Sequence, residues 1–253
     1  MRVTLLGTGT SQGVPVIACK CEVCRSEDAK DKRLRSAIMI EEGVSRIVVD
    51  CGPDFRQQML CHDVDHLDAI LLTHEHADHI FGLDDIRSFN WLQKSPMDIY
   101  CEERVQKNLK SIFKYVFEAN KYPGTPQMDL IDLENSNFKV GPFNITPIRV
   151  YHHKLPVYGF RIGKFAYLTD FNIIEVQDLE KLIGVEILII CALRKAVHIS
   201  HLNLAGALEL IEKIKPRKAF LTHMSHEMGK HRDLVAELPP NVEPGYDGLV
   251  LEI

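Results

Sequence analysis

A dense run of metal-binding side chains follows directly on an apolar segment near the middle of the first half of the chain. Ile70-Leu71-Leu72-Thr73 has the composition of a buried strand, and His74-Glu75-His76-Ala77-Asp78-His79 comes next. Side chains alternate along an extended chain, so His74 and His76 project to the same side and can hold one ion. Asp78 and His79, at the turn into a helix, can reach a second ion about 3.5–4 Å away. The run therefore predicts a two-metal centre where a buried strand ends.

Two ions need more ligands than this run supplies, and three other apolar segments end in suitable side chains. These segments are Tyr151-His152-His153, Tyr167-Leu168-Thr169-Asp170 and Phe220-Leu221-Thr222-His223. A carboxylate can bridge two ions, so we predict that Asp170 lies between them. His152 would complete the first site and His223 the second. Imidazole and carboxylate ligands suit Zn, Mn or Fe and do not choose among them.

The rest of the pattern predicts an α/β fold, because short β-rich runs alternate with helical ones. Two halves, roughly 1–135 and 136–253, both place strands before helices, so we expect one domain of two stacked sheets with helices outside. The expected strands are Val3–Leu6, Ala37–Ile40, Ile47–Val49, Ala69–Leu72, Glu186–Cys191 and Lys218–Leu221, with further β-structure over Phe138–Leu168. The expected helices are Phe55–Leu60, capped by Asp54, and Leu83–Leu92, Val105–Ala119 and Asn203–Ile214.

Composition narrows the functional classes. With 45% hydrophobic and 26% charged residues in 253, the chain has the profile of a soluble globular protein. The formal net charge of −5 argues against an overall basic nucleic-acid binder. No segment approaches the roughly 18 apolar residues of a membrane span, and the N-terminus does not resemble a signal peptide. We therefore expect a cytoplasmic protein that does not bind membranes.

Three of the seven cysteines form a C-x-C-x2-C cluster, Cys19-Lys20-Cys21-Glu22-Val23-Cys24. An odd cysteine count and this tight spacing indicate metal binding in a reducing compartment and not disulfides.

Taken together, these residues resemble the metallo-β-lactamase superfamily, with its signature H-x-H-x-D-H. The segments ending in Asp170 and His223 also fall in family order, so the resemblance covers essentially the whole chain. It implies an αβ/βα four-layer sandwich with the metals at the sheet edges. It also places Asp78 in the catalytic set as well as among the ligands.

A narrower resemblance is to the PhnP-type cyclic phosphodiesterases, which hydrolyse phosphoribosyl 1,2-cyclic phosphate. It is carried by Gly7-Thr8-Gly9-Thr10-Ser11-Gln12-Gly13-Val14-Pro15, by the cysteine cluster and by Asp50-Cys51-Gly52-Pro53-Asp54-Phe55-Arg56. In that group three cysteines and a late histidine hold a structural zinc. The resemblance thus implies a Cys19, Cys21, Cys24 and His226 site, a closed set that suits zinc.

The same resemblance implies a catalytic histidine in His201-Leu202-Asn203-Leu204, with His198 as the competing candidate. This histidine would protonate the leaving oxygen or stabilise the phosphoryl charge.

The first metal site has two candidate histidines. Matching His152-His153-Lys154-Leu155 to the PhnP-type pattern favours His152, whereas counting back from Gly159, as in tRNA 3′-processing endonucleases, favours His153. The first match keeps more neighbours in register, so we predict His152.

The resulting prediction is a dinuclear metal-dependent phosphodiesterase acting on a cyclic or small nucleotide-like phosphodiester. It would hold two divalent ions (Mn or Zn) and one structural Zn. Water bound to a divalent ion has a pKa of roughly 7, so a metal-bound hydroxide would attack phosphorus. The sequence leaves open whether two copies form a homodimer, and nucleic acid is not favoured as a partner.

Three alternatives compete with this prediction. A thioesterase or another hydrolase of carboxyl derivatives would use the same superfamily site. A tRNA 3′-processing nuclease would need a basic arm, and no long Gly/Pro/Lys-rich insertion is visible. A zinc protein without activity would not need two adjacent ions at an open site.

Overall fold

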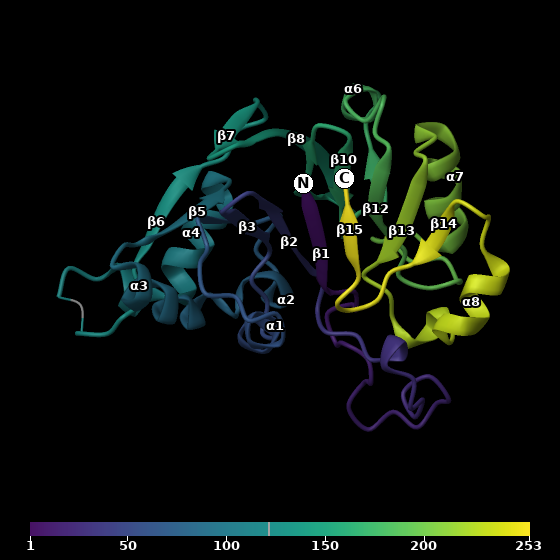
Figure 1. The fold of residues 1–253 in the computed structure, drawn as a ribbon, viewed down its shortest axis with the longest axis horizontal. Helices are drawn as coiled ribbons and strands as arrows, with labels where there is room; N and C mark the ends of the chain where they lie inside the picture. Colours follow the sequence, from purple (N-terminus) through teal and green to yellow (C-terminus); the bar gives the residue numbers. More distant parts are fainter. Residues whose placement is uncertain (121) are drawn as a thin grey trace.

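The computed structural model describes residues 1–120 and 122–253, and its strands form two sheets that pack face to face with helices on the outside (Figure 1). Apart from its last strand, the chain fills one sheet and its helices first and then the other, so most of the sequence colours separate into two sides in Figure 1. The predicted four-layer α/β sandwich is confirmed.

The first sheet comes mainly from the N-terminal part of the chain. In spatial order it contains β15 (Val250–Glu252), β1 (Arg2–Gly7), β2 (Ala37–Glu42), β3 (Ser45–Val49), β4 (Ala69–Leu71), β5 (Met97–Cys101) and β6 (Met128–Asp132). Strands β3 to β6 run parallel to one another, and the last strand of the chain, β15, returns to pair with β1.

The second sheet comes from the C-terminal part. In spatial order it contains β11 (Ile173–Ile174), β8 (Phe143–His152), β9 (Leu155–Ile162), β10 (Phe165–Leu168), β12 (Ile187–Cys191), β13 (Lys218–Thr222) and β14 (Val242–Pro244), with β7 at Phe138–Val140. Strands β10, β12, β13 and β14 are parallel, and β7 pairs with β8 at one side.

Helices connect the strands. The α-helices are α1 (Phe55–Cys61), α2 (Ala77–Ile80), α3 (Arg87–Gln93), α4 (Glu103–Ile112), α5 (Lys114–Phe117), α6 (Val176–Glu180), α7 (Leu204–Ile214) and α8 (His231–Glu237). Short 3₁₀ helices are η1 (Ala29–Asp31), η2 (Leu83–Ile86) and η3 (His226–Met228). No helix among the described residues is both long and apolar enough to cross a bilayer.

The layers follow from the two-residue period of a strand. In β2, Ile38 and Ile40 face the second sheet, whereas Ala37 and Met39 belong to the cluster under the helices. The strand is buried on both faces, which explains why its sequence is apolar without alternation.

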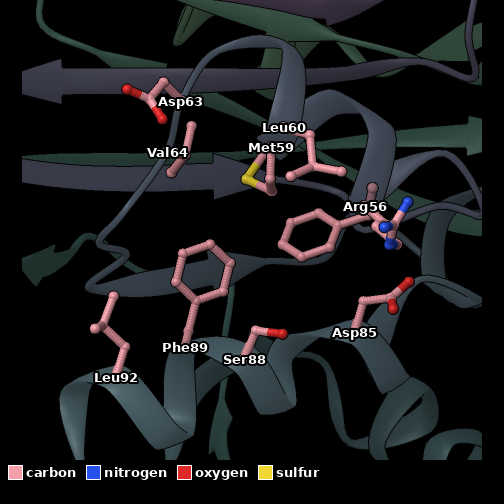
Figure 2. A pocket seen from close by; sticks show the side chains of 10 residues that line it. Arg56, Met59, Leu60, Asp63, Val64, Asp85, Ser88, Phe89 and Leu92 are labelled. Atoms are coloured by element: carbon pink, nitrogen blue, oxygen red, sulfur yellow. The ribbon is translucent and has the colours of Figure 1, made fainter.

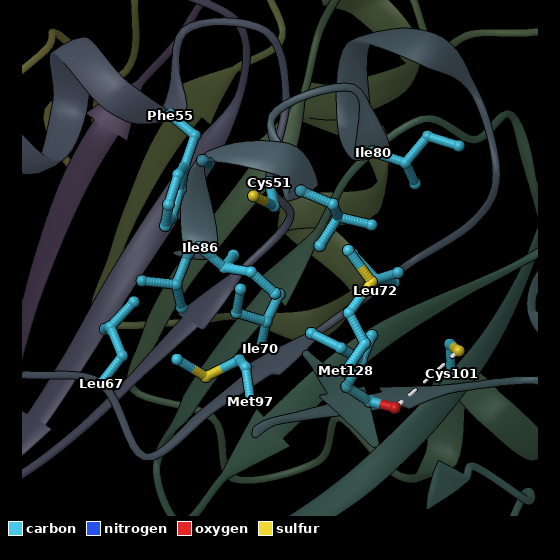
Figure 3. Close-up of a cluster of buried hydrophobic side chains, with 14 of the residues drawn as sticks. Cys51, Phe55, Leu67, Ile70, Leu72, Ile80, Ile86, Met97, Cys101 and Met128 are labelled. Atoms are coloured by element: carbon cyan, nitrogen blue, oxygen red, sulfur yellow. Dashed lines mark hydrogen bonds between the residues drawn. The ribbon is translucent and has the colours of Figure 1, made fainter. Parts of the chain in front are cut away.

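The cluster between the first sheet and its helices is drawn in Figure 3. Ile70 and Met97 extend from the strands, while Phe55 and Ile86 come from α1 and η2. This packing fixes where β4 ends, and therefore where the histidine run begins.

A hollow of about 310 Å³ lies on the outer side of this cluster, between α1 and α3 (Figure 2). The rings of Phe55 and Phe89 meet there edge to face, 6.2 Å apart. Its lining is mainly apolar and holds none of the metal-binding clusters found in the described residues. The clusters of histidine and aspartate lie near the strand ends instead.

Two local predictions need correction. Asp54 precedes α1, but its carboxylate accepts hydrogen bonds from the backbone N–H and Nη1 of Arg35 and does not cap the helix. The helix predicted over Val105–Ala119 is two helices, α4 and α5, because the backbone leaves the helical region at Phe113.

Candidate metal centre

The predicted ligands lie at one edge of the two sheets. His152 is the last residue of β8, Asp170 lies two residues after β10, and His223 directly follows β13. The run that begins at His74 follows β4 in the opposing sheet. Because these strands end at the same edge, segments far apart in the sequence converge there.

The run itself is tied to the second sheet. The backbone carbonyl of Thr73 accepts a hydrogen bond of 3.1 Å from the backbone N–H of Tyr158 in β9. Glu75 forms an ion pair with Arg104, whose other nitrogen donates to the Pro156 carbonyl at 2.7 Å. These contacts hold the histidine-bearing turn over the second sheet.

The potential ligand atoms form two sets that share one residue. The donor atoms of Asp78, His79, Asp170 and His223 lie within 4.8 Å of one another, and those of His74, His76 and Asp170 do the same. One oxygen of Asp170, Oδ2, lies 3.3 Å from Nε2 of His79 and 3.9 Å from Nε2 of His74. Asp170 thus occupies the place expected of a bridging carboxylate.

Hydrogen bonds orient the imidazoles. Nδ1 of His79 lies 2.7 Å from the Asp50 carboxylate, and Nδ1 of His74 lies 2.9 Å from the Thr73 hydroxyl. The Thr73 hydroxyl and backbone N–H donate to Asp50 in turn. When a neighbour engages Nδ1, the other ring nitrogen is left to face a metal.

The ring nitrogens that these hydrogen bonds leave free, the Nε2 atoms, fit metal ions. Nε2 atoms of His74, His79 and His223 are buried and have no hydrogen-bond partner within the described part of the chain. Unpaired buried polar atoms are costly, and three that converge on two carboxylates form a donor set suited to divalent cations.

The electrostatics also favour cation binding. Burial raises the pKa of Asp170, but neighbouring His223 and His79 outweigh it and hold this pKa well below its usual value. Burial keeps the pKa of His74 well below its usual value. The carboxylate is therefore ionised and the His74 lone pair is free at neutral pH, which are the states that bind metal.

The backbone is strained where it leaves the strands. Asp50, Asp170 and His223 have φ angles of 67°, 50° and 54°. Residues other than glycine are uncommon in this left-handed region, although Asp and His tolerate it better than most. Such conformations cluster at functional sites, and here they fall on three residues of the same centre.

His152 lies beside the ligand set of His74, His76 and Asp170. Its ring centroid is 5.2 Å from that of His76, and its Nδ1 lies 2.8 Å from the Ser200 carbonyl, which leaves Nε2 on the other side of the ring. His153 is exposed and has a φ of 59°. The geometry favours His152, and its role as a ligand stays a prediction.

Alanine substitution separates the two histidines. We expect His152→Ala to lose metal from the set that contains His74 and His76. In contrast, His153→Ala should keep the full metal content, because the His153 side chain faces solvent. Metal counting by mass spectrometry of the purified variants checks this, and full retention in His152→Ala would show that the assignment is wrong.

Asp50 is a site residue that the sequence analysis did not assign. It is fully buried, and its carboxylate accepts from Thr73 and contacts His79. A signal for it was present, since Asp50 follows an apolar strand directly, as His223 does. Its partner His79 lies 29 residues away and only the fold brings them together.

We expect Asp50→Asn to weaken metal binding at the set that contains His79. A neutral amide makes the imidazole a poorer donor, and substitutions of this kind typically cost about 10–100-fold in metal affinity or activity. A competition titration with a chromophoric chelator measures the dissociation constant. Asp54→Asn is the matched control, because Asp54 pairs with Arg35 away from the ligand sets. Equal affinities in both variants would contradict this role.

A second cluster joins the cysteine loop to the turn after β13. Sγ atoms of Cys19, Cys21 and Cys24 lie 3.3, 3.3 and 3.6 Å from Nδ1 of His226. Burial raises the pKa of Cys21, but hydrogen bonds from the Cys24 backbone and from His226 outweigh it and lower this pKa to about 6. A thiolate at neutral pH and a closed Cys3His set fit a structural zinc.

We expect Cys21→Ser to lose one zinc per chain and to lower the melting temperature. When the free zinc concentration is a hundredfold above the dissociation constant, binding stabilises the folded protein by about 2.7 kcal/mol. For a chain of this size, this free energy corresponds to about 5–11 °C in melting temperature. Cys61→Ser is the control, because Cys61 is exposed and outside the cluster. Zinc analysis and calorimetry check this, and an unchanged zinc content would refute it.

His201 lies next to both ligand sets. Its ring centroid is 4.3 Å from that of His152 and 5.0 Å from that of His223. The competing candidate, His198, is one ring further out, 5.1 Å from His201. Burial lowers the pKa of His201 to about 3, so its imidazole is neutral at pH 7.

Comparisons with known proteins agree with this architecture. A family model described as a β-lactamase superfamily domain matches residues 45–224. A crystal structure of a new diphosphatase from the PhnP family is 36% identical, with a TM-score of 0.93 over 100% of this chain and 97% of that one. The Zn²⁺-bound PqqB from Methylobacterium extorquens is 18% identical over 100% of both chains, with a TM-score of 0.81, and supports the fold alone.

Two curated relatives are longer proteins. One is an octanoyltransferase of Porphyromonas gingivalis, 42% identical over 98% of this chain and 51% of that protein. The other is a ribonuclease Z of Crocosphaera subtropica, 29% identical over 71% of this chain and 53% of that protein. The chain spans about half the length of these relatives. The family model covers most of the chain, so the resemblance is confirmed, and the chain belongs to the β-lactamase superfamily.

Proposed function

We propose that this protein is a metal-dependent phosphodiesterase that cleaves a cyclic or small nucleotide-like phosphodiester. The observation that carries the proposal is the pair of ligand sets that share Asp170. His74, His76 and Asp170, with His152 beside them, would hold one divalent ion, and Asp78, His79, Asp170 and His223 would hold the other. Bound together, two such ions supply an activated water and positive charge for a phosphoryl group.

The protein's own contribution on the leaving side would come from His201. At neutral pH its imidazole is uncharged, so it first donates an N–H hydrogen bond to the leaving oxygen or to a phosphoryl oxygen. Negative charge that develops on the leaving oxygen would strengthen this hydrogen bond, and the oxygen would take its proton from water. The carboxylates of Asp170 and Asp78 would supply the negative charge that retains the cations.

The relatives support a phosphate substrate more than an acyl one. The solved structure that is 36% identical to this chain is of a diphosphatase, and several relatives are ribonucleases Z. The octanoyltransferase leaves about half of its length unmatched. An octanoyl thioester is therefore a comparison substrate in the experiment.

A substrate panel tests the proposal. We expect hydrolysis of bis(p-nitrophenyl) phosphate and of a 2′,3′-cyclic nucleotide with Mn²⁺ or Zn²⁺ present, and loss of the activity on chelation. The panel also includes an octanoyl thioester and a precursor tRNA, which represent the competing classes. Activity confined to the thioester or to the tRNA would overturn the substrate class.

A further inference from the structure

A polar recess opens beside the metal centre, between it and the Cys3His cluster. It has a volume of about 350 Å³, and three segments line it. Gln12 comes from the loop after β1, Arg194 and His201 come from the loop after β12, and Glu227 comes from η3. A volume of this size fits a small ligand group.

His201 belongs to both the recess and the metal centre. It lines the recess, and its ring packs against those of His152 and His223. If His201 donates to the leaving oxygen, the leaving group lies on its side of the phosphorus. The atoms bonded to that oxygen then extend toward the recess.

The loop that carries these groups is fixed at both ends. The backbone N–H of Leu193 donates to the Leu202 carbonyl at 2.9 Å, and the backbone N–H of Leu202 donates to the Phe171 carbonyl at 2.8 Å. Nη2 of Arg194 donates to the Val197 carbonyl at 3.1 Å. The recess is therefore preorganised, which reduces the entropy cost of binding.

The polar groups of the recess balance in charge. Nη1 of Arg194 pairs with Glu227 at 2.9 Å, so one guanidinium and one carboxylate face the same space. Nε of Arg194 is buried and has no hydrogen-bond partner among the described residues. The amide of Gln12 adds one donor group and one acceptor. Donors and acceptors thus lie together without excess charge.

This composition distinguishes between ligand groups. A second phosphate would meet the Glu227 carboxylate, and like charges at close range are unfavourable. A sugar hydroxyl both donates and accepts, so it can bind Glu227 and Arg194 at once. We propose that the recess binds the hydroxyl-bearing sugar attached to the leaving oxygen, with Arg194 and Glu227 as specificity-determining residues. This inference rests on the proposed phosphodiesterase function.

Two substrates with the same reacting ring test the proposal. Adenosine 2′,3′-cyclic phosphate carries a sugar, whereas ethylene cyclic phosphate has the same five-membered ring without one. Hydrogen bonds to charged groups contribute enough that losing one should raise KM about 10–100-fold. For Arg194→Met and Glu227→Gln we expect this increase with the nucleotide and no change with ethylene phosphate.

Lys195→Met is the matched control, because Lys195 neighbours Arg194 in sequence but pairs with Glu237 outside the recess. Zinc analysis of Glu227→Gln verifies that the adjacent His226 site is intact. If either recess variant leaves the preference between the two substrates unchanged, or slows both equally, the inference is wrong.

Binding measurements keep the inference separate from the proposed function. If the wild-type protein hydrolyses neither substrate, the phosphodiesterase proposal fails. Calorimetry with adenosine 3′-phosphate, and with inorganic phosphate as the probe that lacks a sugar, still tests the recess. We expect tighter binding of the nucleotide in the wild type and loss of that advantage in both variants. Equal binding of both probes by the wild type would overturn the inference.

Discussion

Replacing Asp170 with asparagine is expected to remove metal from both ligand sets and to abolish hydrolysis. Its Oδ2 lies between His79 and His74, and its Oδ1 lies 3.0 Å from Nδ1 of His223, so one carboxylate serves the whole centre. A neutral amide cannot bridge two cations as a carboxylate does. The loss should therefore exceed the about 10–100-fold effect of a residue that only orients a ligand.

Metal analysis and kcat on one diester check this prediction. Asp178→Asn is a suitable control, because Asp178 is also buried but bonds Arg149 and Lys181 away from the centre. The structural zinc of the Cys3His cluster should remain in Asp170→Asn. A variant that keeps both centre ions and more than a tenth of the wild-type rate would contradict the bridging role.

The second large effect is expected for His201→Ala, and it should depend on the leaving group. Removing a hydrogen-bond donor to a leaving oxygen that gains negative charge typically costs about 10²–10³-fold. p-Nitrophenolate is stable without one, so bis(p-nitrophenyl) phosphate should be affected much less than a cyclic nucleotide. The metal content should not change, because His201 is absent from both ligand sets.

Rates of His201→Ala and His198→Ala on the two substrates check this assignment. A loss that is equal for both leaving groups would contradict a hydrogen bond from His201 to the leaving oxygen. A leaving-group-dependent loss confined to His198→Ala would instead assign the role to the competing histidine.

The fold and the placement of the predicted ligands could be anticipated because the relevant signals are local. The apolar run before His74, and the runs before Asp170 and His223, identify strands, and parallel strands end at one edge of a sheet. His74 and His76 were placed together by the period of an extended chain. In the structure, their donor atoms indeed meet that of Asp170. Whether these residues bind metal is still a prediction.

Other features depend on contacts that no local pattern encodes. Pairing of β15 with β1 joins the two ends of the chain. The Asp50–His79 contact and the Arg194–Glu227 pair across the recess also join distant segments. Asp54 shows the converse case, because a residue well suited to cap α1 is instead engaged by Arg35, which lies just before β2. Tertiary contacts override such local preferences.

The most direct test of the central claim is a metal titration of the demetallated protein during hydrolysis of a 2′,3′-cyclic nucleotide. With the structural zinc retained, we expect no activity without added Mn²⁺ and a rate that reaches its plateau at two bound ions per chain. A rate that is independent of metal, or a protein that binds two ions and cleaves no phosphodiester, would contradict the account.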